Sequence, residues 1–199
     1  MRANQVLSSL RKRTRAFKKC GYDLPASRNY IFWKCGFRKG TVLEIGSGKG
    51  HLTACLAKKG LKIISLDLDP ESLRTARMHL AAMKLSKYAI FRRMNAEKLL
   101  FPSQSFDQVI SVDFFHHAKD PVRCLKEMMR VTRKTLVIAD LNKKGMRIMD
   151  RVHRSEGKKH EASRISFEDL KSHLVKNGFI VKRYRHICHQ IFITQRRSL

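Results

Sequence analysis

A glycine-rich run at residues 46–50, Gly-Ser-Gly-Lys-Gly, follows a short apolar segment at residues 42–45 and precedes a helical pattern. A strand that turns in this way into a helix brings backbone N–H groups close to a bound ligand. Seventeen residues beyond Gly50, a second apolar strand ends in Asp67, where a carboxylate can accept hydrogen bonds from both hydroxyls of a ribose. His51 replaces the third glycine of the dinucleotide fingerprint, and no Gly-Lys-Ser/Thr follows, so a nucleoside triphosphate site is not predicted.

Two adjacent histidines, His116 and His117, lie just beyond a predicted strand at residues 106–112. Ligands of open α/β sheets bind at this end of the strands, and an imidazole titrates near neutral pH, so it can accept a proton there. The alternative is structural: one histidine packs beneath the ligand and the other caps the next turn, because Phe114 and Phe115 precede the pair.

A second group of potential ligands lies in the polar connection at residues 142–165: His153, Glu156, His160 and Glu161. If this segment is helical, His153, Glu156 and His160 lie on one side, a spacing that could hold a metal or grip a substrate. Lysines and arginines stand among them and nothing else completes a zinc pattern. A solvated helix face is therefore the preferred interpretation, and no metal site is predicted.

The elements that must position these residues alternate along the chain. Apolar runs predict strands at 41–45, 63–66, 88–92, 106–112 and 135–139, with helices after residues 50, 70 and 121. Such alternation predicts a parallel sheet covered on both faces. A helix beginning near Ser166 precedes two β-rich runs, 179–184 and 187–194, that can pair as an antiparallel hairpin. We expect an α/β fold with a Rossmann-like, doubly wound, seven-stranded, mostly parallel sheet.

The charge is unevenly placed. The chain has a formal net charge of +27, of which residues 1–40 and 142–199 each contribute +10. Residues 5–19 predict a basic helix, so residues 1–40 are interpreted as a basic helical extension or lid. Residues 41–199 form the predicted ligand-binding domain, with residues 142–165 as a lid-like insertion. The charged ends favour contact with a polyanion, nucleic acid or an anionic membrane; the alternative is that they only aid solubility.

Other classes of protein are not supported by the composition. No apolar run approaches the roughly 18–20 residues of a membrane span, and the first residues lack the apolar stretch of a secretory signal. The five cysteines are scattered, with no Cys-x-x-Cys pair. This pattern argues against a disulfide framework and a zinc knuckle, and it predicts a reducing, cytoplasmic setting. The oligomeric state is left open.

Four motifs in order resemble the class I S-adenosylmethionine-dependent methyltransferases, in the ubiquinone-methyltransferase-like (methyltransferase type 11) branch. They are residues 42–50, 65–69, 95–99 and 106–110, and the Phe-His-His at 115–117 also matches that branch. The resemblance implies S-adenosylmethionine as cofactor and S-adenosylhomocysteine as product. Two departures are Asn95, where relatives usually have Asp, and residues 133–135, which replace a Lys-Pro-Gly-Gly turn; an amide oxygen can still accept a hydrogen bond.

The resemblance also assigns roles. Glu44 and the glycines would hold the methionine end of the cofactor, Asp67 the ribose, Leu68 a face of the adenine, and Asn95 with Ala96 the adenine edge. Asp113 would lie beside the methionine moiety. The cofactor-binding residues expected on this basis are Glu44, Gly46, Ser47, Gly48, Gly50, Asp67, Leu68, Asn95, Ala96 and Asp113. His116 and His117 are the candidate catalytic residues.

The sequence excludes some classes of methyl acceptor but does not identify the acceptor itself. Residues 111–115 read Ser-Val-Asp-Phe-Phe, not the Asn/Asp-Pro-Pro-Tyr type of the exocyclic-amine methylases, and no Pro-Cys pair supports cytosine methylation. A small-molecule acceptor is favoured. The alternatives are an RNA methyltransferase that grips phosphates with its basic ends, an acceptor on an anionic lipid surface reached through the 5–19 helix, and a non-catalytic RNA- or protein-binding protein that retains the fold.

Overall fold

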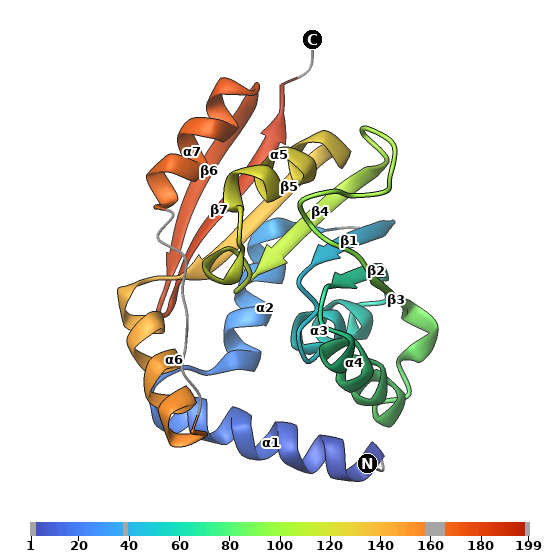
Figure 1. Ribbon diagram of the computed structural model, residues 1–199, viewed down its shortest axis with the longest axis vertical. Coiled ribbons are helices and arrows are strands. Elements are labelled where there is room, and N and C mark those ends of the chain that lie inside the picture. Colours follow the sequence, from blue (N-terminus) through green and yellow to red (C-terminus); the bar gives the residue numbers. More distant parts are fainter. Residues whose placement is uncertain (1–2, 38–39, 158–165, 198–199) are drawn as a thin grey trace.

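The computed structural model describes residues 3–37, 40–157 and 166–197. Its centre is one seven-stranded sheet with the strand order β3-β2-β1-β4-β5-β7-β6 (Figure 1). The strands are β1 Thr41–Ile45, β2 Lys62–Asp67, β3 Ala89–Arg93, β4 Phe106–Val112, β5 Thr132–Leu141, β6 Phe179–His186 and β7 His189–Arg196. The first five are parallel, whereas β7 pairs antiparallel with both β5 and β6. The predicted sheet and its C-terminal hairpin are confirmed.

The helices are α1 Ala3–Lys19, α2 Leu24–Cys35, α3 His51–Lys58, α4 Pro70–Ala82, α5 Pro121–Val131, α6 Lys143–Ser155 and α7 Phe167–Lys176, with short 3-10 turns at Ser86–Tyr88 and Phe115–His117. Side-chain caps begin several of them: Asp69 accepts from two backbone N–H groups of α4, and Ser166 forms a capping box with Asp169. Such caps satisfy N–H groups that the helix itself leaves without partners.

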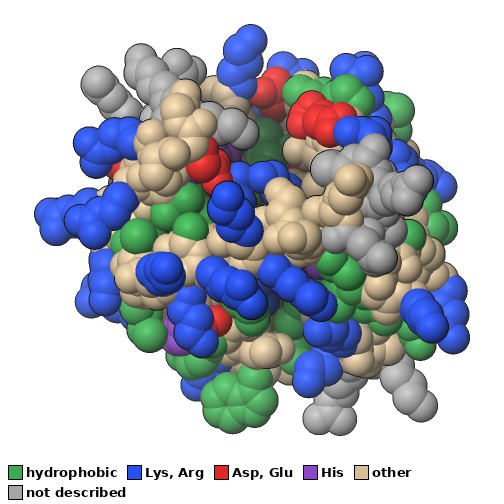
Figure 2. Space-filling model, turned by 90° about the horizontal axis from the view of Figure 1, so that it is seen from below, with side chains coloured by type: hydrophobic (Ala, Val, Ile, Leu, Met, Phe, Trp, Pro, Cys, Tyr) green, Lys and Arg blue, Asp and Glu red, His purple; other side chains and the backbone are tan. Residues whose placement is uncertain are grey.

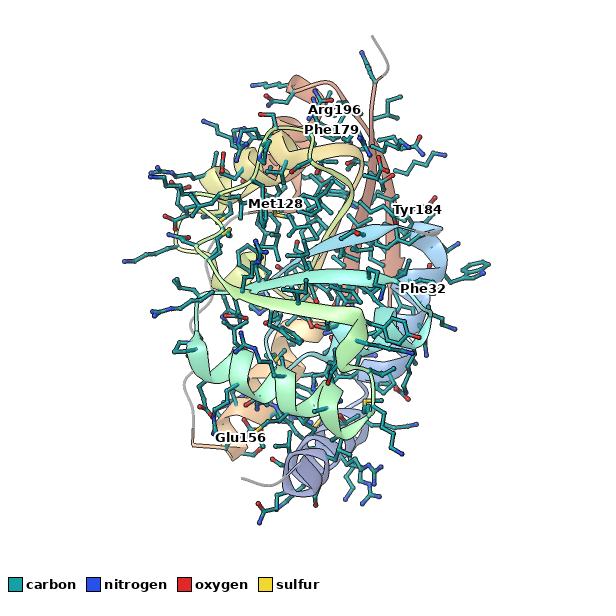
Figure 3. The ribbon with its side chains drawn as sticks, turned by 90° about the vertical axis from the view of Figure 1, so that its right-hand side faces the viewer. Phe32, Met128, Glu156, Phe179, Tyr184 and Arg196 are labelled. Atoms are coloured by element: carbon teal, nitrogen blue, oxygen red, sulfur yellow. The ribbon has the colours of Figure 1, made fainter. Side chains whose placement is uncertain are left out.

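The central strands β1, β4 and β5 are mostly buried on both faces, and they divide their side chains between two cores. Val42 packs with α2 and α3, while its neighbour Leu43 packs with α5 and α7. The same alternation recurs along β4 and β5, as the period of two in a strand requires. Figure 3 views the sheet from the side, with Met128 on one face and Phe32 on the other. The apolar sides of helices therefore cover both faces of the sheet, and the ends of its strands are left uncovered by them.

A third apolar cluster joins the N-terminal segment to α6. Phe17 of α1 packs with Ile148, Met149 and Val152 of α6, next to Leu141 at the end of β5. α1 also contacts α4, so it crosses the molecule below the carboxyl ends of the parallel strands (Figure 1). This cluster was not predicted, because residues 142–165 read as a polar connection; their first part is the helix α6, and residues 158–165 lie outside the described residues. The lid-like role of this segment stays a prediction.

Candidate functional site

A cavity of about 920 Å³ lies at the carboxyl ends of β1, β2 and β4, with α1 and α6 on its far side. Most of the predicted site residues line it together: Gly46, Gly48, Asp67, Leu68, Asn95, Ala96, Asp113, His116 and His117. Glu44, Ser47 and Gly50 do not line the cavity; they support the loop that does. The fold therefore brings most of the predicted site residues together.

The loop after β1 needs glycine for two different contacts. Gly46 has φ +81°, and a Cβ there would lie 2.8 Å from Cδ2 of Phe114. Gly50 has φ +75°, and a Cβ there would lie 3.2 Å from the Cα of Ala76 in α4. Both values of φ fall in the left-handed region that other residues rarely adopt. The first glycine brings the loop against a cavity residue, and the second lets α3 begin close to α4.

Asp67 is held so that its carboxylate faces the cavity. Its Oδ2 accepts a hydrogen bond from the Gly48 N–H at 2.8 Å, and its Oδ1 accepts one from the Asp69 N–H at 3.0 Å. The next residue, Leu68, is 57% exposed although apolar. Asn95 uses its side-chain oxygen to accept from the Glu97 N–H at 2.9 Å, so it shapes its own turn. A carboxylate beside an exposed apolar side chain suits a ribose joined to a planar base.

Glu44 lies beneath this loop and is 1% exposed. Its Oε2 accepts hydrogen bonds from the hydroxyls of Thr53 at 2.6 Å and Ser65 at 2.7 Å. Burial raises the pKa of Glu44 to about 7, because the two hydroxyl bonds offset only part of the cost of a buried charge. Among the described residues, Oε1 is buried without a hydrogen-bond partner. The atom can accept a hydrogen bond from a group bound above it.

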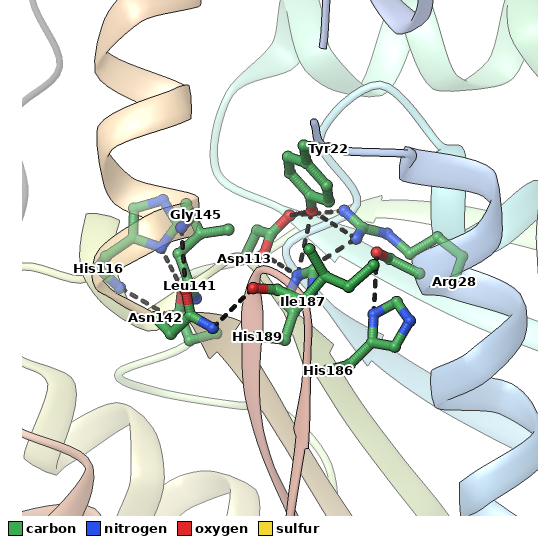
Figure 4. Close-up of polar contacts among 12 residues, drawn as sticks. Tyr22, Arg28, Asp113, His116, Leu141, Asn142, Gly145, His186, Ile187 and His189 are labelled. Atoms are coloured by element: carbon green, nitrogen blue, oxygen red, sulfur yellow. Dashed lines mark hydrogen bonds and ion pairs between the residues drawn. The ribbon is translucent and has the colours of Figure 1, made fainter. Parts of the chain in front are cut away.

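Asp113 is the centre of a buried polar network (Figure 4). Its carboxylate accepts from Arg28 Nη2 at 2.6 Å and from the Tyr22 hydroxyl at 2.8 Å, and His189 Nε2 lies 2.8 Å from it. Burial alone would raise the pKa of Asp113, but the charges of Arg28 and His189 outweigh it and hold that pKa well below its usual range. Asp113 therefore fastens α2 and β7 to the end of β4, a role sequence analysis missed.

His116 pairs with a second carboxylate that the sequence did not single out. Its Nδ1 bonds to Asp140 near the end of β5, and its backbone N–H donates to the same carboxylate at 3.0 Å. Burial lowers the pKa of His116, but the hydrogen bond and charge of Asp140 outweigh burial, so the pKa is raised overall. The ring of His117 lies 4.1 Å from that of His116. An acid near the end of the next predicted strand was the available signal for Asp140.

The far wall of the cavity comes from α1 and α6. Arg13 of α1 lies 2.8 Å from Nε2 of His153 in α6 and 3.3 Å from Oε2 of Glu156, which caps the end of that helix. The interpretation of His153 as part of a solvated helix face is wrong, because His153 is half-buried, contacts Arg13 and lines the cavity. The reason is tertiary, because α1 comes from the opposite end of the chain. Glu156 is exposed, as that interpretation expects, although it pairs with Arg13. His160 and Glu161 lie outside the described residues.

Across residues 3–37, 40–157 and 166–197, three or more His, Cys, Asp or Glu side chains nowhere gather in a way that could hold a metal ion. Within the same ranges, every helix is too short or too polar to cross a membrane.

The comparisons agree with this geometry. Residues 43–139 match the family described as methyltransferase domain. A ubiquinone biosynthesis O-methyltransferase of Parvibaculum lavamentivorans is 30% identical over 139 residues, which cover 69% of this chain and 51% of that protein. The chain belongs to the class I S-adenosylmethionine-dependent methyltransferases. A phosphatidylethanolamine N-methyltransferase of Cereibacter sphaeroides is 35% identical over 97 residues, 49% of this chain and 47% of that enzyme. The chain thus spans about half the length of these curated relatives.

Solved structures of methyltransferases share the fold. An S-adenosylmethionine-dependent methyltransferase from Aquifex aeolicus has a TM-score of 0.65 at 19% identity, covering 84% of this chain and 88% of that one. Magnesium protoporphyrin IX methyltransferase from Synechocystis, solved with bound S-adenosylmethionine, has a TM-score of 0.66 at 16% identity, with 87% and 78% covered. S-adenosylmethionine is the cofactor of the family. The oriented Asp67 carboxylate, the exposed Leu68 and the buried Glu44 Oε1, which has no hydrogen-bond partner among the described residues, fit that cofactor.

Proposed function

We propose that this protein transfers a methyl group from S-adenosylmethionine to a small-molecule acceptor. The observation that carries the proposal is one cavity lined by two chemically different groups. Asp67 and the glycine loop line it, and so does His116, which is paired with Asp140. A cofactor held by Asp67 and the loop would share the cavity with His116.

Different residues of the cavity and its loop bind different parts of the cofactor. Asp67 accepts the ribose hydroxyls, Leu68 covers a face of the adenine, and Asn95 with Ala96 borders its edge. Gly46, Ser47, Gly48 and Gly50 form the loop around the methionine part, with Glu44 below and Asp113 beside it. When bound, S-adenosylmethionine supplies an activated methyl group on a sulfonium. These assignments extend the resemblance onto side chains that the cavity brings together.

His116 is the candidate general base. In an in-line displacement, the acceptor atom bonds to the methyl carbon while the carbon–sulfur bond breaks and sulfur keeps the electron pair. An acceptor hydroxyl must also lose its proton, and neutral His116 can take that proton because Asp140 holds the imidazole in position. Positioning the acceptor supplies much of the remaining rate enhancement. His117 lies beside the same point and would orient the acceptor.

A small acceptor is supported by the cavity and by the relatives. The cavity is bounded by α1 and α6, which leaves room for a compact molecule next to the cofactor. The relatives named above are a ubiquinone biosynthesis O-methyltransferase and a phosphatidylethanolamine N-methyltransferase. An RNA acceptor is supported only by the basic ends of the chain. The non-catalytic alternative predicts that S-adenosylmethionine does not bind.

Calorimetry and labelled-methyl transfer test the proposal. We expect Asp67→Ala to weaken S-adenosylmethionine binding by about ten- to 100-fold, because two hydrogen bonds to a charged group are lost. Asp107→Ala is the matched control, since Asp107 lies on β4 away from the cavity and pairs with Arg133. Absence of binding by the unaltered protein would overturn the proposal. Transfer from labelled cofactor to fractionated small molecules and RNA, assayed separately, distinguishes the acceptors.

A further inference from the structure

The two helices that border the cavity, α1 and α6, are apolar on their inner side and cationic on their outer side. The inner side of α1 holds the buried Val6, Leu10 and Phe17. Its outer side holds five exposed cations: Arg11, Lys12, Arg15, Lys18 and Lys19. The spacing of these positions places them on one side of the helix. Figure 2, which views the molecule from below, shows Lys and Arg side chains spread across this face.

α6 repeats this arrangement beside α1. Its inner side holds Met149, Val152 and His153, and its exposed cations are Lys143, Lys144, Arg147, Arg151 and Arg154. Few acids offset them. α1 contains none and α6 contains only Asp150; Asp23 pairs with Lys18, and Glu156, just after α6, pairs with Arg13. We call the ten exposed cations of α1 and α6 the basic rim, because both helices also line the cavity.

We propose that the basic rim docks the protein on an anionic phospholipid surface and that the cavity takes its acceptor from that surface. The second half rests on the proposed methyltransferase function; the docking itself does not. Lys and Arg side chains held near an anionic leaflet attract it additively, by about five-fold in partition for each cation. A continuous sheet of phosphates meets a row of cations without needing a particular sequence or fold of the partner.

The side chains favour a lipid surface over nucleic acid. Proteins that bind single strands stack bases on exposed aromatic rings, but within the described part of α1 and α6 the one aromatic side chain besides histidine is Phe17, which is buried. The wall that α1 and α6 give the cavity includes Phe17 and Met149, and Leu24 at the start of α2 packs in the same apolar cluster and also lines the cavity. This apolar wall beside a cationic rim fits an acceptor that has a hydrocarbon part and lies in an anionic lipid surface.

Vesicle sedimentation of the full chain tests the docking. We expect binding to phosphatidylcholine vesicles that contain phosphatidylglycerol, whose charge gives the surface a negative potential, and little binding to vesicles of phosphatidylcholine alone. The combined variant R11Q, K12Q, R15Q and K19Q should bind the anionic vesicles at least about 50-fold more weakly. High salt should reduce the binding of the unaltered protein, because exposed charges are screened.

A matched variant controls for total charge. K171Q, K176Q, K182Q and R197Q remove the same number of exposed cations from α7, β6 and the chain end, away from α1 (Figure 1), and should keep most of the binding. Equal loss in both variants would overturn the proposal, as would tight binding to structured RNA with none to vesicles. Circular dichroism checks folding. Calorimetry with S-adenosylmethionine is run in parallel, so failure of the methyltransferase assignment is seen separately from failure of docking.

Discussion

Asp140 holds His116 in its orientation. The Asp140 carboxylate is hydrogen-bonded to the ring Nδ1 of His116 and accepts a second hydrogen bond from its backbone N–H. These two bonds fix the rotation and the tautomer of the imidazole. The same carboxylate raises the pKa of His116 despite burial. A base of this kind works only when it is neutral, so methyl transfer should rise as the pH passes upward through that raised pKa.

Asp140→Asn tests this relation. Removing the negative charge should lower the pKa of His116, so the acidic limb of the kcat profile should move to lower pH. The kcat itself should fall at least about ten-fold, because the ring is less well oriented. The measurement is a pH profile of labelled-methyl transfer, with His116→Gln as the variant that removes the limb. A fall in kcat with an unmoved limb would assign Asp140 a structural role only.

Glu44 links stability to pH in the ligand-free protein. Its pKa is about 7 in the folded chain, above its ordinary value of 4.5, so the folded state binds the proton more tightly. The free energy of unfolding should therefore fall as the pH rises between those values. Glu44→Gln, which mimics the protonated form, should be more stable than the unaltered protein at pH 8, by an amount on the order of 3 kcal/mol.

Urea denaturation at several pH values measures this difference. The advantage of Glu44→Gln should shrink toward pH 4.5 and below. Glu71→Gln is the control, because Glu71 is exposed at the start of α4 and should show no such advantage. Parallel stability curves for the unaltered protein and Glu44→Gln would contradict the assignment.

The first turn of α6 packs closely against the C-terminal hairpin. Asn142 caps the helix by accepting from the Gly145 N–H at 2.9 Å, and its side-chain amide donates to the Ile187 carbonyl at 3.1 Å (Figure 4). A Cβ on Gly145 would lie 2.4 Å from the carbonyl oxygen of Cys188. Backbone cannot give way as a flexible side chain does, so the helix itself must move.

Gly145→Ala should destabilise the protein by about 1–3 kcal/mol, the usual range for overpacking. Thermal or urea unfolding measures the change, and Arg151→Ala on the exposed side of α6 is the control, expected within about 0.5 kcal/mol. An unchanged stability of Gly145→Ala would show that α6 can shift without cost. Because α6 lines the cavity, a shift should also alter methyl transfer.

Sequence reasoning succeeded for elements whose side chains repeat regularly. β1, β4 and β5 alternate between two cores, so their apolar runs were readable in the chain. α6 was missed because Ile148, Met149 and Val152 stand among many cations and looked like parts of a polar connection. The partners of Asp113 could not be predicted either: Arg28 and His189 reach it from 85 and 76 residues away, and no local spacing encodes such a contact.

The Asp113 network joins three distant parts of the molecule. Arg28 from α2 and His189 from β7 meet at the end of β4, all largely buried. A buried ion pair contributes little by itself, but removing one partner leaves a charge without compensation. The N-terminal helices are thereby tied to the sheet at the same point where the cavity begins.

Arg28→Ala should lower the free energy of unfolding by about 3–5 kcal/mol. Arg74→Ala is the matched control, because Arg74 pairs with Glu71 on the surface of α4, and its removal should lower the free energy of unfolding much less. Chemical denaturation measures both. Similar small effects for the two variants would mean that Asp113 finds water or another donor when Arg28 is removed.

The strand order leaves β3 and β6 at the two edges of the sheet. Edge strands offer unpaired backbone groups to any other chain, which is a route to aggregation. β3 exposes Arg92 and Arg93, and β6 exposes Lys182 and Arg185, so two copies approaching edge to edge bring like charges together. The net charge of +27 thus also gives colloidal protection, which weakens as salt screens it. Concentrated solutions should stay clear at low ionic strength and scatter more light as salt is added.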